Sequence, residues 1–574
     1  MSICLVDPAK RRGRLTTTSR CTDSYQLDHH QEIQTIFCVD PIHSNRMPFP
    51  VNTGGSSIAT QVCMLRCAGH DAKTYPRTLA LATTLALSAF LVGCGSTPVA
   101  GGTHPGAAVA ADGTRPGVPV AADFLGLSME WCKAQTVLGQ ASAGGNDAIF
   151  AQYVANLRAY GAGPMWIRIG GDSTDTGGSC GTPTGIQSVQ AMNEFARATA
   201  AKFSFGLNLV SDDLSASKAQ AAAYCAGMPS GSIAAFEIGN EPDLYTTAGW
   251  TANTYSDELS QYLAGVLTAQ SCTSNLMGPS FASFNGSHGD FVPNIQNILA
   301  TNQGKGLGTV TQHYYAGANT VTSGFLLTTA ADNGPARALP ELQAAHALGM
   351  TYRVDEMNSA WGGGAARVSN AFESALWFIE NAAELAAEGV DGINVHGGML
   401  AGKGYNYYTP FFITAGGGGS FSLNNDGSFP ATAPLYYGML FFARAINGAH
   451  STISPASIGT NANIDAWSTV DGAGTERLIM ANRDIANGAQ VVIAQSASTA
   501  SVCYLEAPSY SSTNGLKIFS NFAGTTYQTF DTSTDGSPTG TAGWDVLMPN
   551  DGSFTIPIAA AQAAIVTFGV STGC

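Results

Sequence analysis

Short apolar runs alternate with amphipathic stretches along most of the chain after residue 120. Eight apolar runs are predicted to be β-strands: 124–130, 165–169, 203–209, 234–238, 276–279, 309–314, 351–355 and 392–395. Between them, apolar residues recur at helical spacing, as at Phe150, Tyr153, Val154 and Leu157. Alternating strands and helices pair in parallel, so eight such units predict an α/β fold with a closed (β/α)8 barrel over residues 116–446. An open doubly wound sheet is the alternative. It is disfavoured because no glycine-rich phosphate turn follows the first strand.

Helical spacing disappears beyond residue 446. Short β-like runs, among them 476–483, 489–495, 515–522 and 563–570, are separated there by Gly, Asn, Asp and Ser. This pattern predicts an antiparallel β-sandwich over residues 447–574. A strand near residues 116–122 is a further candidate member of the sandwich.

The N-terminal hundred residues follow neither pattern. Residues 1–63 lack a hydrophobic period and are expected to be an untranslated or disordered leader. Residues 64–94 resemble a lipoprotein signal peptide, because basic residues precede an apolar run that ends in Leu91-Val92-Gly93-Cys94. The apolar run, about 15 residues, is shorter than the roughly 20 that span a bilayer. An uncleaved membrane anchor is the alternative reading.

These features predict an exported lipoprotein of the bacterial cell envelope, in the outer membrane or periplasm, or a secreted protein. Cys94 is the expected lipidation site, and the Gly-, Ala- and Pro-rich residues 95–115 are expected to form a flexible linker. Six cysteines follow Cys94, which permits three disulfides in 15 arrangements. The expected pairs are Cys132 with Cys180, Cys225 with Cys272, and Cys503 with Cys574.

Charge narrows the class of partner. The whole chain carries a formal net charge of −15. Beyond residue 94 there are 16 basic and 34 acidic residues, a net charge of −18. Such a surface repels polyanions, which argues against nucleic acid and weighs against densely sulfated glycans.

Two carboxylates stand at strand ends where a barrel of this kind carries its chemistry. The fourth predicted strand runs into Gly239-Asn240-Glu241-Pro242-Asp243, and the seventh runs into Asp355-Glu356-Met357. Cleavage of a glycosidic bond needs such a pair, one carboxyl group protonated and the other ionised. The sequence therefore predicts that Glu241 and Glu356 meet in one cavity.

These motifs resemble the large clan of retaining (β/α)8 glycosidases with catalytic glutamates on strands four and seven. Within that clan the chain most resembles glycoside hydrolase family 79, which contains bacterial β-glucuronidases and heparanases. The resemblance covers the exported part of the chain and is narrowest in the run 356–364, EMNSAWGGG.

The resemblance implies that Glu241 is the acid/base, Glu356 the nucleophile, and Asn240 a contact of the sugar 2-hydroxyl. Further expected substrate contacts are Glu130, Asp172, His313, Tyr314, Trp361, Gly362, Gly363, Tyr405 and Tyr407. Among these, Tyr314 would hydrogen-bond the nucleophile, and the glycine backbone with a tyrosine would hold the C6 carboxylate. Asp172 stands where the family usually has an uncharged residue, and Trp361 where heparanases have tyrosine.

The expected activity is that of an exo-acting β-glucuronidase working by double displacement, without metal or other cofactor. Its expected partners are a carbohydrate substrate and, through the lipid alone, a membrane. An endo-acting heparanase-like enzyme is the nearest alternative, but it would need a cleft lined by basic residues. A glycan-binding lipoprotein whose barrel no longer catalyses is the alternative of another class.

Overall fold

The computed structural model describes residues 36–39, 61–64, 107–111, 117–140, 145–146, 148–175, 189–282, 289–332, 334–397, 407–411, 432–448, 450–458, 462–530 and 535–574. Residues 1–101 and 102–574 form two separate units. In the first, β1 (Ile36–Val39) pairs in parallel with β2 (Gln61–Met64). The rest of the predicted leader and signal peptide, including Cys94, lies outside the described residues.

Eight parallel strands of the second unit close into a barrel. Around the barrel they are β5 (Leu125–Glu130), β8 (Trp166–Gly170), β9 (Lys202–Leu207), β10 (Ile233–Ile238), β11 (Leu276–Phe281), β12 (Leu307–Ala318), β13 (Thr351–Trp361) and β14 (Gly392–His396). Each corresponds to one of the eight predicted apolar runs, so the (β/α)8 prediction is confirmed. The runs are nearly continuous in hydrophobicity because strands of a parallel barrel are covered on both faces.

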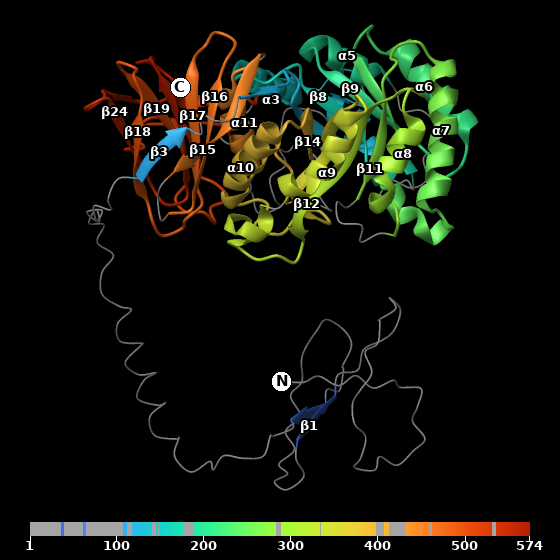
Figure 1. Ribbon diagram of the computed structural model, residues 1–574, viewed down its shortest axis with the longest axis horizontal. Coiled ribbons are helices and arrows are strands. Elements are labelled where there is room, and N and C mark those ends of the chain that lie inside the picture. Colours follow the sequence, from blue (N-terminus) through green and yellow to red (C-terminus); the bar gives the residue numbers. More distant parts are fainter. Residues whose placement is uncertain are drawn as a thin grey trace. The chain divides into compact units, whose positions relative to one another are not determined.

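Helices cover the outside of the barrel (Figure 1). They are α3 (Ala148–Ala159), α5 (Val189–Thr199), α6 (Leu214–Gly227), α7 (Ala252–Ala269), α8 (Ile295–Asn302), α9 (Gly334–Ala347), α10 (Glu373–Glu388) and α11 (Pro434–Ile446). On α3 the predicted apolar face, from Phe150 to Leu157, is fully buried. Within the described residues, no helix has both the length and the apolar character needed to cross a bilayer.

Strands β12 and β13 are longer than predicted. Both continue past the barrel rim as a paired ribbon, in which Gly317 lies opposite Ala360 and Ala318 opposite Trp361. Strand β13 also carries an extra residue, Asp355, relative to both of its neighbours. Such a bulge turns the following side chains to a new direction. It lies immediately before Glu356.

The C-terminal strands form the predicted antiparallel sandwich beside the barrel (Figure 1). They are β15 (Ser451–Ile458), β16 (Ile464–Val470), β17 (Glu476–Asn482), β18 (Ala489–Ala494), β19 (Ala500–Glu506), β20 (Lys517–Ser520), β21 (Tyr527–Thr529), β22 (Thr539–Thr541), β23 (Asp545–Leu547), β24 (Ser553–Ile558) and β25 (Gln562–Phe568). Two earlier segments, β3 (Ala107–Ala111) and β4 (Val118–Val120), pair with β15.

The position of β3 corrects one prediction. Residues 107–111 were expected to belong to a flexible linker, but they form a strand between β15 and β18. Unpaired backbone groups at a strand edge favour the addition of another strand, whatever the composition of the added segment. The predicted membership of residues 116–122 in the sandwich agrees with the pairing of β4.

One apolar cluster extends from the barrel helices into the sandwich, and a second lies within the sandwich. Along β17, Leu478 and Met480 face the interior of the sandwich, whereas Ile479 and Ala481 belong to the cluster that continues into the barrel helices. Helices α10 and α11 form the barrel side of this contact and pack against β15 and β17. The alternation of side chains in a strand thus lets β17 serve two cores at once.

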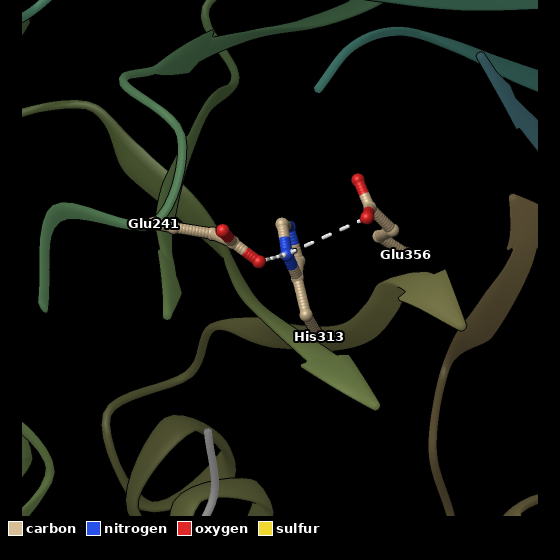
Figure 2. Close-up of side chains that lie close together, drawn as sticks. All are labelled: Glu241, His313 and Glu356. Atoms are coloured by element: carbon tan, nitrogen blue, oxygen red, sulfur yellow. Dashed lines mark hydrogen bonds and ion pairs between the residues drawn. The ribbon is translucent and has the colours of Figure 1, made fainter. Parts of the chain in front are cut away.

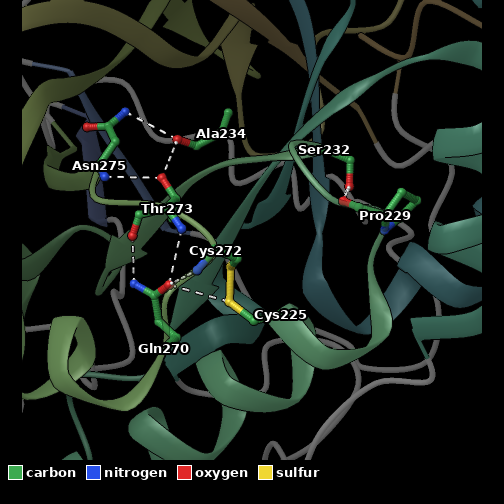
Figure 3. The surroundings of a disulfide bond; sticks show 8 residues. All are labelled: Cys225, Pro229, Ser232, Ala234, Gln270, Cys272, Thr273 and Asn275. Carbon is green, nitrogen blue, oxygen red and sulfur yellow. Dashed lines mark hydrogen bonds between the residues drawn. A yellow bond between two sulfur atoms is a disulfide. The ribbon is translucent and has the colours of Figure 1, made fainter.

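Two of the expected disulfides are present, Cys225 with Cys272 and Cys503 with Cys574. The first joins the end of α6 to the segment after α7. There, Oε1 of Gln270 accepts hydrogen bonds from the backbone N–H groups of Cys272 and Thr273 (Figure 3). Cys132 is also disulfide-bonded, and its expected partner Cys180 lies outside the described residues.

Candidate active site

The segment after β10 places Glu241 at the mouth of the barrel. Gly239 and Glu241 both have positive φ, 79° and 49°. The backbone N–H of Glu241 donates to the carbonyl of Ser280, 3.0 Å away, in the neighbouring strand β11. The side chain of Glu241 keeps 17% of its surface exposed. A glutamate in the left-handed conformation is strained. This backbone conformation directs the carboxylate toward the centre of the mouth.

Glu356 reaches the same place from β13, directly after the bulge at Asp355. It lies opposite His313 of β12 in the strand register, and its side chain is 10% exposed. One ligand atom each of Glu241, His313 and Glu356 lie within 4.8 Å of one another. Figure 2 shows the two carboxylates approaching the imidazole from opposite sides. Glu241 and Glu356 therefore come together as predicted, at the mouth of the barrel.

His313 is hydrogen-bonded to one carboxylate and close to the other. Its Nδ1 atom lies 2.9 Å from Oε1 of Glu241 and 4.0 Å from Oε1 of Glu356. Burial opposes the charged imidazole, but the charge of Glu356 and the hydrogen bond to Glu241 outweigh it and raise the pKa of His313 to about 9. His313 and Glu241 consequently hold a proton between them at neutral pH.

Arg168, on β8, is the buried cation beneath the pair. Its Nη1 donates to Oε2 of Glu356 at 2.6 Å, and its Nε and Nη2 donate to the two oxygens of Glu237 at 2.7 and 2.5 Å. Nη2 also donates to Oδ1 of Asn240 at 2.8 Å. A guanidinium has donors enough to hold several acceptors in fixed directions. Arg168 therefore fixes the positions of residues from two strands of the mouth.

The surroundings of Glu356 favour its ionised form. Burial would raise its pKa, but the nearby imidazoles of His396 and His313 and the charge of Arg168 hold the pKa well below its usual range. His396, at the end of β14, has its Nδ1 3.4 Å from Oε2 of Glu356. The Tyr315 hydroxyl donates to Oε1 at 2.7 Å. A carboxylate held ionised in this way is suited to act as a nucleophile.

The tyrosine that contacts Glu356 is Tyr315, which corrects the prediction of Tyr314. Tyr314 points out of the barrel, where its hydroxyl donates to the Ala331 carbonyl at 2.8 Å and its ring lies 6.3 Å from that of Trp377. Successive side chains of a strand face opposite sides, so His313 and Tyr314 cannot both line the mouth. The same rule, applied from His313, would have selected Tyr315.

Other predicted contacts lie at one rim of the cavity. An oxygen of Glu130 accepts the backbone N–H of Ser173 at 2.9 Å, and Nδ2 of Asn240 lies 3.4 Å from Oδ1 of Asp172. Asp172 still reaches solvent, yet partial loss of water and the charges of Glu241 and Glu130 raise its pKa to about 7. Asn240, Glu130 and Asp172 thus offer polar atoms to a ligand on the Glu241 side.

The ribbon of β12 and β13 forms another part of the rim. Trp361 ends β13 with 56% of its surface exposed. Gly362 and Gly363 follow with φ of 76° and 89°, a conformation that only glycine adopts readily. The carbonyl of Gly363 accepts the backbone N–H of Tyr407 at 2.7 Å. Predicted contact Tyr405 lies outside the described residues.

Trp131, which directly follows the first predicted strand, belongs to the core. It is 7% exposed and donates from Nε1 to the hydroxyl of Tyr224 at 2.9 Å. Of these two, Trp361 is the exposed tryptophan.

Glu241, His313 and Glu356 are also a set that could coordinate a cation. Their ligand atoms already form hydrogen bonds, however, because Nδ1 of His313 bonds Glu241 while Arg168 and Tyr315 donate to Glu356. Arg168 in particular supplies positive charge where an ion would have to sit. The donor set fits a proton-holding network better than a metal.

Sequence reasoning missed three residues that contact Glu356: Arg168, Tyr315 and His396. A signal existed for Arg168, since it is the single charged residue in the apolar run 165–169 and a buried arginine must be paired. His396 follows the eighth predicted strand directly, at the same height as the two glutamates. A polar residue at that end of any barrel strand is a candidate for the mouth.

Comparisons with known proteins agree with the fold and give a partial match in sequence. No family profile matches the chain. A β-glucuronidase from Aspergillus niger is 26% identical over 232 residues, which cover 36% of this chain and 42% of that enzyme. The match therefore spans less than half of the relative's length.

Solved structures align over most of this chain. A 4-O-α-L-rhamnosyl-β-D-glucuronidase from Fusarium oxysporum has a TM-score of 0.64 and 18% identity, covering 80% of this chain and 100% of that one. A family 51 α-L-arabinofuranosidase from Bifidobacterium longum has a TM-score of 0.57 and 13% identity, covering 81% and 100%. At these identities the two structures establish the barrel-and-sandwich fold alone.

Proposed function

We propose that this chain is a retaining glycoside hydrolase that removes terminal β-linked glucuronic acid from glycans, with Glu356 as nucleophile and Glu241 as acid/base. The observation that carries the proposal is the meeting of the two carboxylates around His313, within 4.8 Å, at the mouth of the barrel. Retaining glycosidases place their carboxyl groups about 5–5.5 Å apart, whereas inverting ones leave roughly 6.5–9.5 Å for a water molecule. The short separation supports double displacement.

In the first step an oxygen of Glu356 attacks the anomeric carbon, and the glycosidic C–O bond breaks. Glu241 gives its proton to the departing oxygen, so the leaving alcohol is neutral and the sugar remains as an ester of Glu356. The hydrogen bond between His313 and Glu241 supplies the proton reserve for this step. Arg168 and Tyr315 hold the attacking carboxylate in place.

In the second step water attacks the same carbon while Glu241, now ionised, takes its proton. The ester bond breaks, Glu356 leaves as a carboxylate, and the product keeps its original anomeric configuration. Departure of Glu356 is favoured by the cationic surroundings that hold its pKa low. The same contacts thus serve both halves of the cycle.

Two features support a glucuronide as the substrate. The partial match to an enzyme named as a β-glucuronidase favours this sugar. The glycines Gly362 and Gly363, both with positive φ, also follow Trp361 directly. Backbone N–H groups of glycine-rich turns can bind an anion without a basic side chain, so the C6 carboxylate is assigned to this turn.

The test is hydrolysis of 4-nitrophenyl glycosides by purified protein. Turnover of the β-D-glucuronide well above that of the β-D-glucoside and α-L-arabinofuranoside is expected, with Glu356→Gln as the inactive control. NMR of the first-formed sugar should show the β-anomer. Preference for a neutral glycoside would contradict the substrate, and an α-anomer would contradict the mechanism.

Action at the chain end is tested on an oligosaccharide with a terminal glucuronic acid. Release of free glucuronic acid, with the remaining glycan shortened by one residue, is expected. Large internal fragments would instead favour an endo-acting enzyme.

A further inference from the structure

We propose that Asp175 is a positioning residue that holds the acid/base Glu241 in its working conformation, through the backbone of Asn240. The inference rests on the proposed function and adds to it a residue that touches neither carboxylate of the catalytic pair. Asp175 is the last residue of the short helix α4 (Asp172–Asp175), which follows β8. Its exposed fraction is 6%.

The carboxylate of Asp175 binds the loops after two further strands. Oδ1 accepts the backbone N–H groups of Leu209 and Val210, at 2.8 and 3.4 Å, in the segment after β9. Oδ2 accepts the backbone N–H of Asn240 at 2.6 Å and the hydroxyl of Tyr245, both after β10. One buried side chain therefore ties together the segments that follow three consecutive strands of the barrel.

This contact falls at the point where the backbone is strained. Gly239 and Glu241, on either side of Asn240, have positive φ. A glutamate keeps that conformation only if its surroundings impose it. Three successive backbone N–H groups hold it here: that of Gly239 donates to the Leu207 carbonyl, that of Asn240 to Asp175, and that of Glu241 to the Ser280 carbonyl. Without the Asp175 carboxylate, the N–H of Asn240 keeps the longer contact with the Tyr245 hydroxyl, 3.3 Å away, and that hydroxyl has itself lost its acceptor.

Asp175 also lacks the paired cation that usually accompanies a buried carboxylate. Among the described residues it forms no ion pair with Lys, Arg or His, whereas Glu237, Asp355 and Glu356 all pair with Arg168. A buried acid without a cation is costly, and burial raises the pKa of Asp175 to about 7. Its contribution to the site is therefore to accept hydrogen bonds from the backbone N–H groups of the neighbouring loops.

The position of Glu241 can be measured through the leaving group. Departure of phenol needs the proton of the acid/base, whereas departure of 2,4-dinitrophenol does not, and kcat/KM reports the first step alone. We expect Asp175→Asn to lower kcat/KM by about 30-fold for the phenyl β-D-glucuronide and by less than about threefold for the 2,4-dinitrophenyl β-D-glucuronide, a share of the roughly 10²–10⁴-fold that general acid catalysis contributes.

Glu373→Gln is the matched control. Glu373 is likewise buried, forms no ion pair among the residues described, and accepts backbone N–H groups, those of Gly324 and Leu326. It touches neither Asn240 nor Glu241, so any loss of activity should be equal for both substrates. Thermal unfolding of each variant measures how much of a change in activity comes from loss of folded protein.

Tyr245→Phe gives a second, milder measurement. It removes the hydroxyl that donates to Asp175 and should produce the same selectivity for the phenyl substrate, at about threefold. If Asp175→Asn does not fold, Tyr245→Phe decides the question. Equal losses on both substrates overturn the positioning role. A wild-type protein that hydrolyses neither glucuronide overturns the proposed function instead.

Discussion

Nδ1 of His313 lies 2.9 Å from Oε1 of Glu241, and the same atom is 4.0 Å from Oε1 of Glu356. The imidazole is thus the electrostatic link between the two carboxylates. It can hold the proton that Glu241 needs as an acid. While the imidazole is charged, it favours ionisation of Glu356.

The pair of His313 and Glu241 should set the alkaline limit of activity. The pKa of His313 is raised to about 9, so the pair keeps its proton at neutral pH and loses it as the pH rises through about 9. We expect kcat/KM to fall with an apparent pKa near that value, which belongs to the pair as a whole. In His313→Gln the alkaline limb should move to lower pH. A limb that does not move would show that another group controls it.

Tyr315→Phe and Tyr314→Phe form a matched pair of adjacent substitutions. The first removes the 2.7 Å hydrogen bond to Glu356 and should lower kcat by about 10- to 100-fold. The second removes the bond to the Ala331 carbonyl, so it should cost about 1 kcal/mol of stability and leave kcat unchanged. The measurements are steady-state kinetics and urea unfolding. The reverse pattern would restore Tyr314 as the residue of the site.

Trp361→Ala should affect binding of extended substrates alone. The indole is 56% exposed at the end of the ribbon, so its removal should leave the melting temperature within about 1 °C, because exposed substitutions seldom change stability. Stacking of a sugar on the ring would be lost, and KM for a glucuronic-acid-terminated oligosaccharide should rise about tenfold at unchanged kcat. An unchanged KM would remove Trp361 from the substrate path.

Glu341→Gln should stabilise the protein at alkaline pH. Glu341 is 2% exposed, and burial raises its pKa to about 8, above the roughly 4.3 of an unfolded chain. A raised pKa means that the folded state binds the proton more tightly, so the stabilising contribution is full below pH 4 and is lost as the pH rises through 8. The substitution should therefore raise the melting temperature at pH 8.5 and leave it nearly unchanged at pH 4.5. Equal effects at both pH values would contradict burial as the cause.

Periodicity predicted most of the fold because its signal is strong in buried parallel strands. All eight barrel strands overlap their predicted apolar runs. The extension of β12 and β13 was not predicted, because beyond the rim the two strands pair with each other and their residues are no longer continuously apolar. β3 escaped it too, because pairing with β15 and β18 depends on their backbone edges and leaves no mark in the five residues 107–111.

The meeting of Glu241 and Glu356 was predictable because strand ends converge in any barrel of this type. Their supporting residues were harder to identify. The extra residue at Asp355 shifts the phase of β13 by one position, and nothing in the composition of 351–361 announces it. Arg168 is recognisable as a lone charge in an apolar run, but its partners come from segments 69 and 188 residues away.

The double-sided burial of β17 has a consequence for how the protein can be divided. Ile479 and Ala481 complete the core of the barrel helices, so the barrel without its C-terminal strands would expose a large apolar surface to water. The barrel and the sandwich should therefore fold only together. A gene fusion or truncation that places the junction at residue 447 should yield insoluble protein rather than a smaller enzyme.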